Sequence, residues 1–308
     1  YQLGATDYER FAAEYAFFGR SVWQQTLNLT DEEKTELIRL LQENYRPENR
    51  VYRYNFFYDN CATRPRDKIE ESIAGKVIYP AEPQDGSLTF RDIVHQYCKG
   101  HPWARFGIDL CIGSEADQPI TQRQMMFAPF YLMDAFDGAQ IKSDSIQRPL
   151  ITANELVVDA TPEPDESDWM PTPLQCSLLL FILTAAATIY GIRRRTGLWG
   201  IDLFLFGIAG IVGCVLAFLA LFSQHPAVSS NFLLLVFHPG QLLFLPYIIY
   251  CVRKGKKCWY LTLNLAVLTL FIVLFPVIPQ RFDFAVVPLA LVLLIRSASN
   301  LIVTSKKK

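Results

Sequence analysis

The chain has 308 residues, of which 51% are hydrophobic, and its 29 basic residues nearly balance its 30 acidic ones. This balance lacks the basic excess typical of nucleic-acid binding, so we expect no nucleic-acid partner. Up to about residue 170 charges recur every few residues, whereas long apolar runs dominate beyond it. The sequence therefore predicts a water-exposed domain followed by a membrane domain.

The first elements of the amino-terminal part alternate between strand and helix patterns. Residues 22–29 (VWQQTLNL) and 51–58 (VYRYNFFY) have the alternation and aromatic content of strands. Between them, residues 30–44 predict a helix that opens with a capping box of Thr30 and Glu33. Residues 63–73 (TRPRDKIEESI) predict a second helix, which tolerates its proline only in the first turn.

The rest of this part predicts mainly helix. Residues 85–98 predict a helix, 107–121 a loop with a short strand, and 124–139 another helix. Residues 158–172 are acidic and proline-rich, which is typical of a linker. We therefore predict an outer domain over 1–157.

The carboxyl-terminal part contains five stretches that are apolar enough to cross a bilayer, whose core of about 30 Å needs roughly 20 helical residues. Between Arg195 and Arg253 the only charged side chain is Asp202. The predicted spans are 173–192, 199–222, 231–252, 259–278 and 284–303. We therefore predict a five-helix transmembrane bundle within residues 173–308.

The positive charges beside the spans predict their orientation. Basic clusters follow the first, third and fifth spans, at 193–195, 253–257 and 306–308. The two remaining loops, 223–230 and 280–283, contain a single basic residue between them, Arg281. The positive-inside rule puts the clusters and the carboxyl terminus in the cytoplasm. With five spans, the amino-terminal domain then lies outside, in the periplasm of a bacterium or the lumen of a eukaryotic compartment.

The first residues show no signal peptide, since Tyr1 is not followed by a basic segment and an apolar run. An exported domain needs an upstream signal or anchor, so we expect this chain to be processed or truncated.

Cys61 precedes the helix predicted over 63–73, at the junction with the preceding strand. Unpaired N–H groups and the helix dipole favour an anion at such a position, which suits a nucleophilic thiol and the oxyanion of acyl transfer. The alternative is a disulfide, because the outer domain also contains Cys98 and Cys111. A bond between these two would leave Cys61 free, but spacing alone does not determine the pairing.

Four segments carry a resemblance to a known family. NFFYDNCATRPRD, GRSVWQQTLNLTDEEKTEL, GIDLCIGSEADQPIT and QMMFAPFYL closely resemble the amino-terminal periplasmic domain of the Lnb family, the lipoprotein N-acyltransferases of Bacteroides-type bacteria. The membrane half, with its HPAVSSN loop, fits the same family. The family is similar to circularly permuted papain-like enzymes, in which an Asn-Cys pair opens the central helix. The resemblance implies an α+β fold: a permuted papain-like periplasmic domain followed by the five-helix bundle.

The implied reaction is acyl transfer at the outer leaflet of the bacterial inner membrane. Cys61 would take an acyl chain from a phospholipid as a thioester, and the α-amine of a diacylated lipoprotein would accept it. No cofactor or metal is required. Asn60 would orient the base or donate to the oxyanion, and it also fits a helix cap. The family's catalytic His lies in a Gly-His-Thr segment upstream of Tyr1, so we expect either a base outside this chain or a substitute within it.

Further candidates follow from residue type and position. Arg64 is a candidate for phosphate binding, with an ion pair as the alternative, and Arg66 is expected to pair with Asp67 or Glu70. His225 and Asn231 resemble the family's HP…N pattern and are candidates for substrate binding or domain docking.

The other polar candidates have structural interpretations beside the functional ones. His95 reads as a residue on a helix face and His101 as a loop residue. His238 interrupts the third span with Pro239 and Gly240, which suggests a function unless neighbouring helices satisfy it. Arg296 is expected to snorkel or to bind a lipid headgroup.

Two other function classes stay open on sequence grounds. A membrane-anchored cysteine hydrolase or peptidase of the cell envelope would use the same thiol, although one anchor would serve it. A non-catalytic membrane scaffold would explain the spans and treat Cys61 as structural. A thioester that hydroxylamine cleaves would separate acyl transfer from the scaffold, and turnover of peptides would favour the hydrolase.

Overall fold

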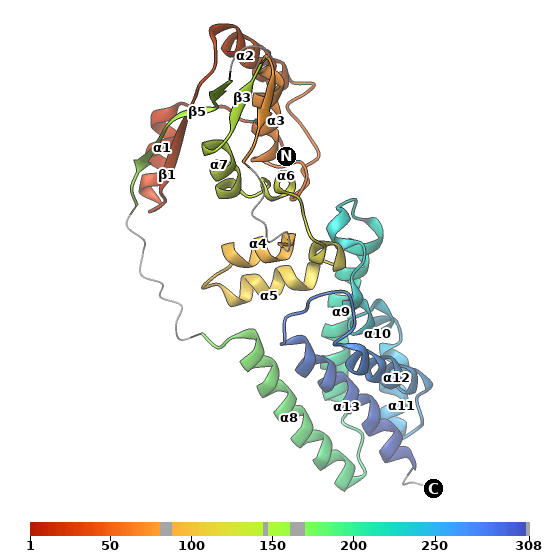
Figure 1. Cartoon of the computed structure of the whole chain (residues 1–308). Coiled ribbons are helices and arrows are strands. Elements are labelled where there is room, and N and C mark those ends of the chain that lie inside the picture. The colour runs from red at the N-terminus through yellow and green to blue at the C-terminus, as the bar shows by residue number, and fades with distance from the viewer. Residues whose placement is uncertain (81–87, 144–146, 161–169, 306–308) are drawn as a thin grey trace. The chain divides into compact units, whose positions relative to one another are not determined.

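The computed structural model describes residues 1–80, 88–143, 147–160 and 170–305 (Figure 1). Most of the predicted linker and the start of the helix predicted over 85–98 lie outside the described residues. The internal contacts divide the chain into two compact units. The first comprises Tyr1–Ile93 and Pro119–Glu166, and the second comprises Val94–Gln118 and Ser167–Lys308. Residues 94–118 therefore pack with the membrane helices, and the second unit is called the membrane unit below.

The first unit mixes helices with two small antiparallel sheets, which confirms the α+β class. Its strands are β1 (Val22–Leu27) paired with β5 (Ile151–Val158), and β2 (Lys76–Ile78), β3 (Gln140–Lys142) and β4 (Gln147–Pro149) in the order β2-β3-β4. Its helices are α1 (Tyr8–Phe17), α2 (Asp31–Tyr45), α3 (Thr63–Ser72), α6 (Gln122–Met125) and α7 (Pro129–Asp137). Helix α4 (Phe90–Tyr97) begins in the first unit and ends in the second.

Helix α2 confirms the predicted capping box and shows a further use of its glutamate. Glu33 accepts hydrogen bonds from the N–H groups of Thr30 at 2.8 Å and Ala74 at 3.1 Å, and it forms an ion pair with Arg148. Burial alone would raise the pKa of Glu33, but these donors outweigh it and hold the pKa below its usual range. The carboxylate therefore links α2 to segments distant in sequence.

Three local predictions in this part are wrong. Residues 51–58 form no strand beyond isolated bridges at Val51 and Asn55, and 56–58 form a turn, because the Asn55 side chain accepts from the N–H groups of Phe57 and Tyr58. The loop predicted over 107–121 is instead largely helix α5 (Pro102–Cys111) and a 3₁₀ turn (Ser114–Asp117), since Pro102 opens α5 in its first turn. The helix predicted over 124–139 is divided into α6 and α7, because the residue before Pro129 is extended.

The second unit contains three helices within the described residues that are long and apolar enough to cross a membrane: α8 (Pro173–Arg194), α9 (Trp199–Phe222) and α13 (Val286–Ser305). Helices α11 (Leu245–Lys254) and α12 (Trp259–Leu274) form a fourth candidate only as a pair, bent by 111°. The five continuous spans predicted from composition are therefore not observed in the described part of the chain.

Prolines explain the difference. The third predicted span is interrupted at Pro239 and Pro246, leaving a 3₁₀ turn η4 (Phe232–Leu235), the short helix α10 (Pro239–Leu243) and α11. Helix α12 ends at Leu274, two residues before Pro276.

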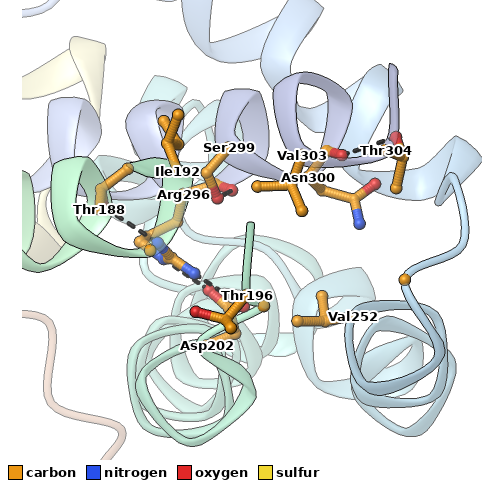
Figure 2. Close-up of a pocket in the computed structure, with 13 residues that line it drawn as sticks. Thr188, Ile192, Thr196, Asp202, Val252, Arg296, Ser299, Asn300, Val303 and Thr304 are labelled. Atoms are coloured by element: carbon orange, nitrogen blue, oxygen red, sulfur yellow. Dashed lines mark hydrogen bonds and ion pairs between the residues drawn. The ribbon is translucent and has the colours of Figure 1, made fainter. Parts of the chain in front are cut away.

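A buried ion pair joins three of the membrane helices (Figure 2). Arg296 on α13 donates from Nε and Nη2 to the two carboxylate oxygens of Asp202 on α9, at 2.7 and 3.0 Å. Its Nη1 donates to the hydroxyl of Thr188 on α8 at 2.9 Å. Both charged side chains are only 2% exposed. The expectation that Arg296 would snorkel or bind a headgroup is therefore wrong, because a carboxylate within the bundle neutralises it.

Candidate functional site

Cys61 lies in a short loop, two residues before α3 begins, and it is exposed. The residues around it are buried, among them Asn60, Ala62 and Thr63. Beneath the loop, the rings of Phe57, Phe90 and Phe127 lie in mutual contact, with centroid separations between 4.3 and 5.3 Å. The Cys61 thiol is therefore accessible, whereas the residues that hold its loop in place are buried.

The Asn60 side chain fixes the backbone on both sides of the thiol. Its Oδ1 accepts from the N–H groups of Ala62 at 2.8 Å and Thr63 at 2.9 Å, which caps α3. Its Nδ2 donates to the carbonyl oxygens of Phe56 and Phe127, both at 2.8 Å. These four bonds confirm the capping role and tie the Cys61 loop to a segment that is distant in sequence.

This capping changes the expected oxyanion site. The sequence suggested that the first free N–H groups of the helix would hold an oxyanion, but those of Ala62 and Thr63 already donate to Asn60. Donors for an oxyanion must therefore come from elsewhere around the thiol.

Two tyrosines beside Cys61 were not singled out from the sequence. Burial raises the pKa of both Tyr52 and Tyr54, and a charge on the Cys61 sulfur adds to the rise in each case. Both phenols therefore stay protonated, and able to donate a hydrogen bond, when the thiolate forms. Their alternation within 51–58 was the available signal, but it was interpreted as the packing of a strand.

The two arginines of α3 have different environments. Arg64 forms a bidentate ion pair with Asp59, at 2.6 and 2.8 Å, and its guanidinium stacks 3.6 Å above the Tyr52 ring. Arg66 is buried and pairs with Asp67, as the sequence predicted, and it also donates to the carbonyl oxygen of Arg123. Arg64 keeps 29% of its side chain exposed, so it is the more accessible cation.

The histidines of the described residues fall in the second unit. On α4, the Nε2 of His95 lies 2.8 and 3.0 Å from the two carboxylate oxygens of Asp109, which is itself buried. His101 is exposed and precedes α5. His238 precedes α10 as its N-cap, and its Nε2 lies 3.3 Å from the Oδ1 of Asn264. Within the membrane unit, His238 is thus satisfied by a neighbouring helix.

His225 and Asn231, the two loop candidates, lie in the segment that follows α9. His225 is partly buried, and burial lowers its pKa. Asn231 is buried, with its Nδ2 donating to the carbonyl oxygen of Leu110 at 2.7 Å and its Oδ1 accepting from Leu233 and Gln280. The amide of Asn231 therefore fastens the end of α5 to the segments that follow α9 and α12.

All seven cysteines lie within the described residues, and all are free thiols. The suggested bond between Cys98 and Cys111 is therefore absent from the structure. Burial raises the pKa of both of these thiols, and the charge of Asp109 adds to the rise for Cys98. Both are also less exposed than Cys61, so a substrate would reach them less easily.

Comparison with protein families assigns both parts of the chain. Residues 1–95 match the Lnb N-terminal periplasmic domain, and residues 165–308 match the Lnb transmembrane domain. No curated protein and no solved structure shows a significant match.

Proposed function

This chain belongs to the Lnb family, and on that premise we propose that it is a lipoprotein N-acyltransferase whose nucleophile is the Cys61 thiol. The family assigns the protein to lipoprotein maturation in the membrane, with a periplasmic amino-terminal domain and membrane-spanning helices. The observation that carries the proposal is the exposed Cys61, held rigidly by Asn60 at the start of α3.

The reaction proceeds in two transfers. In the first, the Cys61 thiolate attacks the carbonyl carbon of a phospholipid ester, the C–S bond forms, and the C–O bond breaks to release a lysophospholipid that takes up a proton. In the second, the α-amine of a diacylated lipoprotein attacks the thioester, the C–N bond forms, and the C–S bond breaks. The amine loses a proton and the thiolate is restored. Two moderate barriers replace the single difficult formation of an amide from an ester.

The neighbours of Cys61 have distinct proposed roles. Asn60 acts as a positioning residue, because all four of its bonds go to the backbone. The protonated hydroxyls of Tyr52 and Tyr54 are candidate donors to the oxyanion, in place of the N–H groups that Asn60 occupies. Arg64 is the candidate for the phosphate of the donor, which would share the guanidinium with Asp59.

The two loop candidates have different proposed roles in the membrane unit. Asn231 acts by holding α5 in place, because its amide is committed to backbone groups of Leu110 and Leu233. His225 lies directly before the 3₁₀ turn η3 (Pro226–Val228), in the loop that follows α9, and is the candidate there for contact with substrate.

The orientation follows the basic clusters. Arg193 to Arg195 lie at the end of α8, and residues 253–257 lie at the end of α11 and directly after it. We therefore place both of these helix ends, and the carboxyl terminus, in the cytoplasm of a bacterial inner membrane.

The test is mass spectrometry of lipoprotein amino-terminal peptides from cells in which this protein, expressed from its own gene, is the sole N-acyltransferase. We expect triacylated peptides from the intact protein and diacylated ones from Cys61→Ser at equal membrane abundance. Cys214→Ser, which changes another exposed cysteine within α9, is the matched control and should leave the product triacylated. A triacylated product from cells with Cys61→Ser would exclude Cys61 as the nucleophile. A failure to find triacylated peptides in cells with the intact protein would exclude the diacylated lipoprotein as the acceptor.

A further inference from the structure

An apolar crevice of about 170 Å³ opens in the second unit, between α8, α9 and α13 and under α5. Helix α9 supplies one wall through Phe204, Leu205, Ile208, Ala209 and Val212. These positions follow helical spacing and form one stripe along the helix. The roof is formed by Phe106 and Leu110 of α5. The other walls come from Leu180 of α8, from Phe237, and from Leu289, Val292 and Leu293 of α13.

The crevice has a closed floor and an open side. Leu205 and Ala209 on α9 are buried, whereas Phe204 and Ile208 on the same stripe are 63% and 48% exposed. Because these helices cross a membrane, the open side faces lipid and the occupant comes from the bilayer.

The depth of the crevice matches one leaflet. Phe204 and Val212 are eight residues apart on a continuous helix, which corresponds to about 12 Å. Half of a hydrocarbon core of about 30 Å is about 15 Å. The Arg296–Asp202 pair holds the start of α9 level with the middle of α13, so the α9 stripe lies beside the first turns of α13. In the orientation proposed above these first turns are at the outer end of α13, and the crevice therefore lies in the outer half of the bundle.

The roof helix also carries a cation next to one of the roof residues in sequence. Arg105 precedes Phe106 on α5 and is 48% exposed. Its Nε lies 3.9 Å from Asp109, the limit of an ion pair, and His95 already bonds to that carboxylate. The guanidinium thus offers a site for a phosphate group. A glycerophospholipid has this phosphate, whereas the diacylglyceryl group of a lipoprotein does not.

We propose that this crevice binds one acyl chain of an outer-leaflet glycerophospholipid, whose phosphate contacts Arg105. The assignment rests on the proposed function, in which a phospholipid is the acyl donor: Arg105 holds the phosphate while the lipid occupies the crevice, and Arg64 is the candidate for the phosphate when the ester reacts with Cys61. Since lipid tails are already in an apolar medium, the hydrophobic effect contributes little, and close packing along the stripe together with the charged contact retains the lipid.

The test is photolabelling of the full-length protein in vesicles that contain phosphatidylglycerol with a diazirine near the end of one acyl chain. We expect adducts in the peptides that cover 204–212 and 289–293. Ile208→Trp narrows the open rim and should abolish these adducts. Leu203→Trp adds the same side chain on another face of α9, where the native leucine is 44% exposed, and should leave them unchanged.

A further variant and a second probe distinguish a phospholipid from a lipoprotein as the occupant. Arg105→Gln should lower labelling by the phospholipid, and a photoreactive diacylglyceryl lipopeptide should label the crevice poorly. Preferential labelling by the lipopeptide, or adducts spread evenly over the exposed helix faces and insensitive to Ile208→Trp, would overturn the proposal. Cys61→Ser should retain the crevice adducts while losing triacylation, so the failure of one proposal is distinguishable from the failure of the other.

Discussion

Removing one partner of the Arg296–Asp202 pair should destabilise the membrane unit far more than removing both. Arg296 makes two bonds to Asp202 and one to Thr188, and both charges are 2% exposed. Asp202→Leu leaves a buried guanidinium with only Thr188, at an expected cost of about 3–5 kcal/mol. Arg296→Met leaves the carboxylate buried and should cost a similar amount. The double variant leaves no buried charge at this position, and its expected change is near zero, or a gain of about 1–4 kcal/mol.

The assay is reversible unfolding of the purified protein in micelles for the four members of this cycle. Each single variant should lower Tm by roughly 10 °C, and the double variant should regain most of that loss. Glu36→Gln on α2 is the control: it removes a solvent-exposed ion pair with Arg39 and should have no measurable effect. Single losses that simply add in the double variant would refute the reasoning, because they would mean that the two charges do not compensate each other.

Three other predictions concern different parts of the chain. Asn60→Ala should lower the unfolding free energy of the first unit by about 2–4 kcal/mol, measured by denaturant titration, because it uncaps α3 and removes the hydrogen bonds that Asn60 donates to two carbonyl oxygens. Asn60→Asp, which keeps the cap, should lose less. Because folding depresses the pKa of Glu33, its stabilisation is present above the unfolded value of 4.5 and is lost as pH falls through the folded value. The stability difference between the native protein and Glu33→Gln should therefore shrink on acidification below 4.5, and a constant difference would contradict this. Gly213→Ala should reduce folded protein in membranes, because its Cβ would overlap the backbone of His238, whereas Gly200→Ala on the same helix meets open space and should be tolerated.

Predictions based on neighbouring residues succeeded where the interaction itself is local. The capping box of α2 joins residues three apart, and the first turn of α3 accepts Pro65, so both helices could be predicted from sequence. The Asn-Cys pair also identified the candidate nucleophile. The strand predicted from the alternation in 51–58 does not form, because the Asn55 side chain closes a turn there. A turn of this kind competes with strand pairing.

Composition determined that the second half is a membrane domain, but only the tertiary structure decided how its polar groups are used. Arg296 and Asp202 are 94 residues apart, and Asn60 and Phe127 are 67 residues apart. No periodicity in the sequence relates such positions. A buried charge or amide must find a partner at the cost of its desolvation, and which partner it finds depends on which helices pack together.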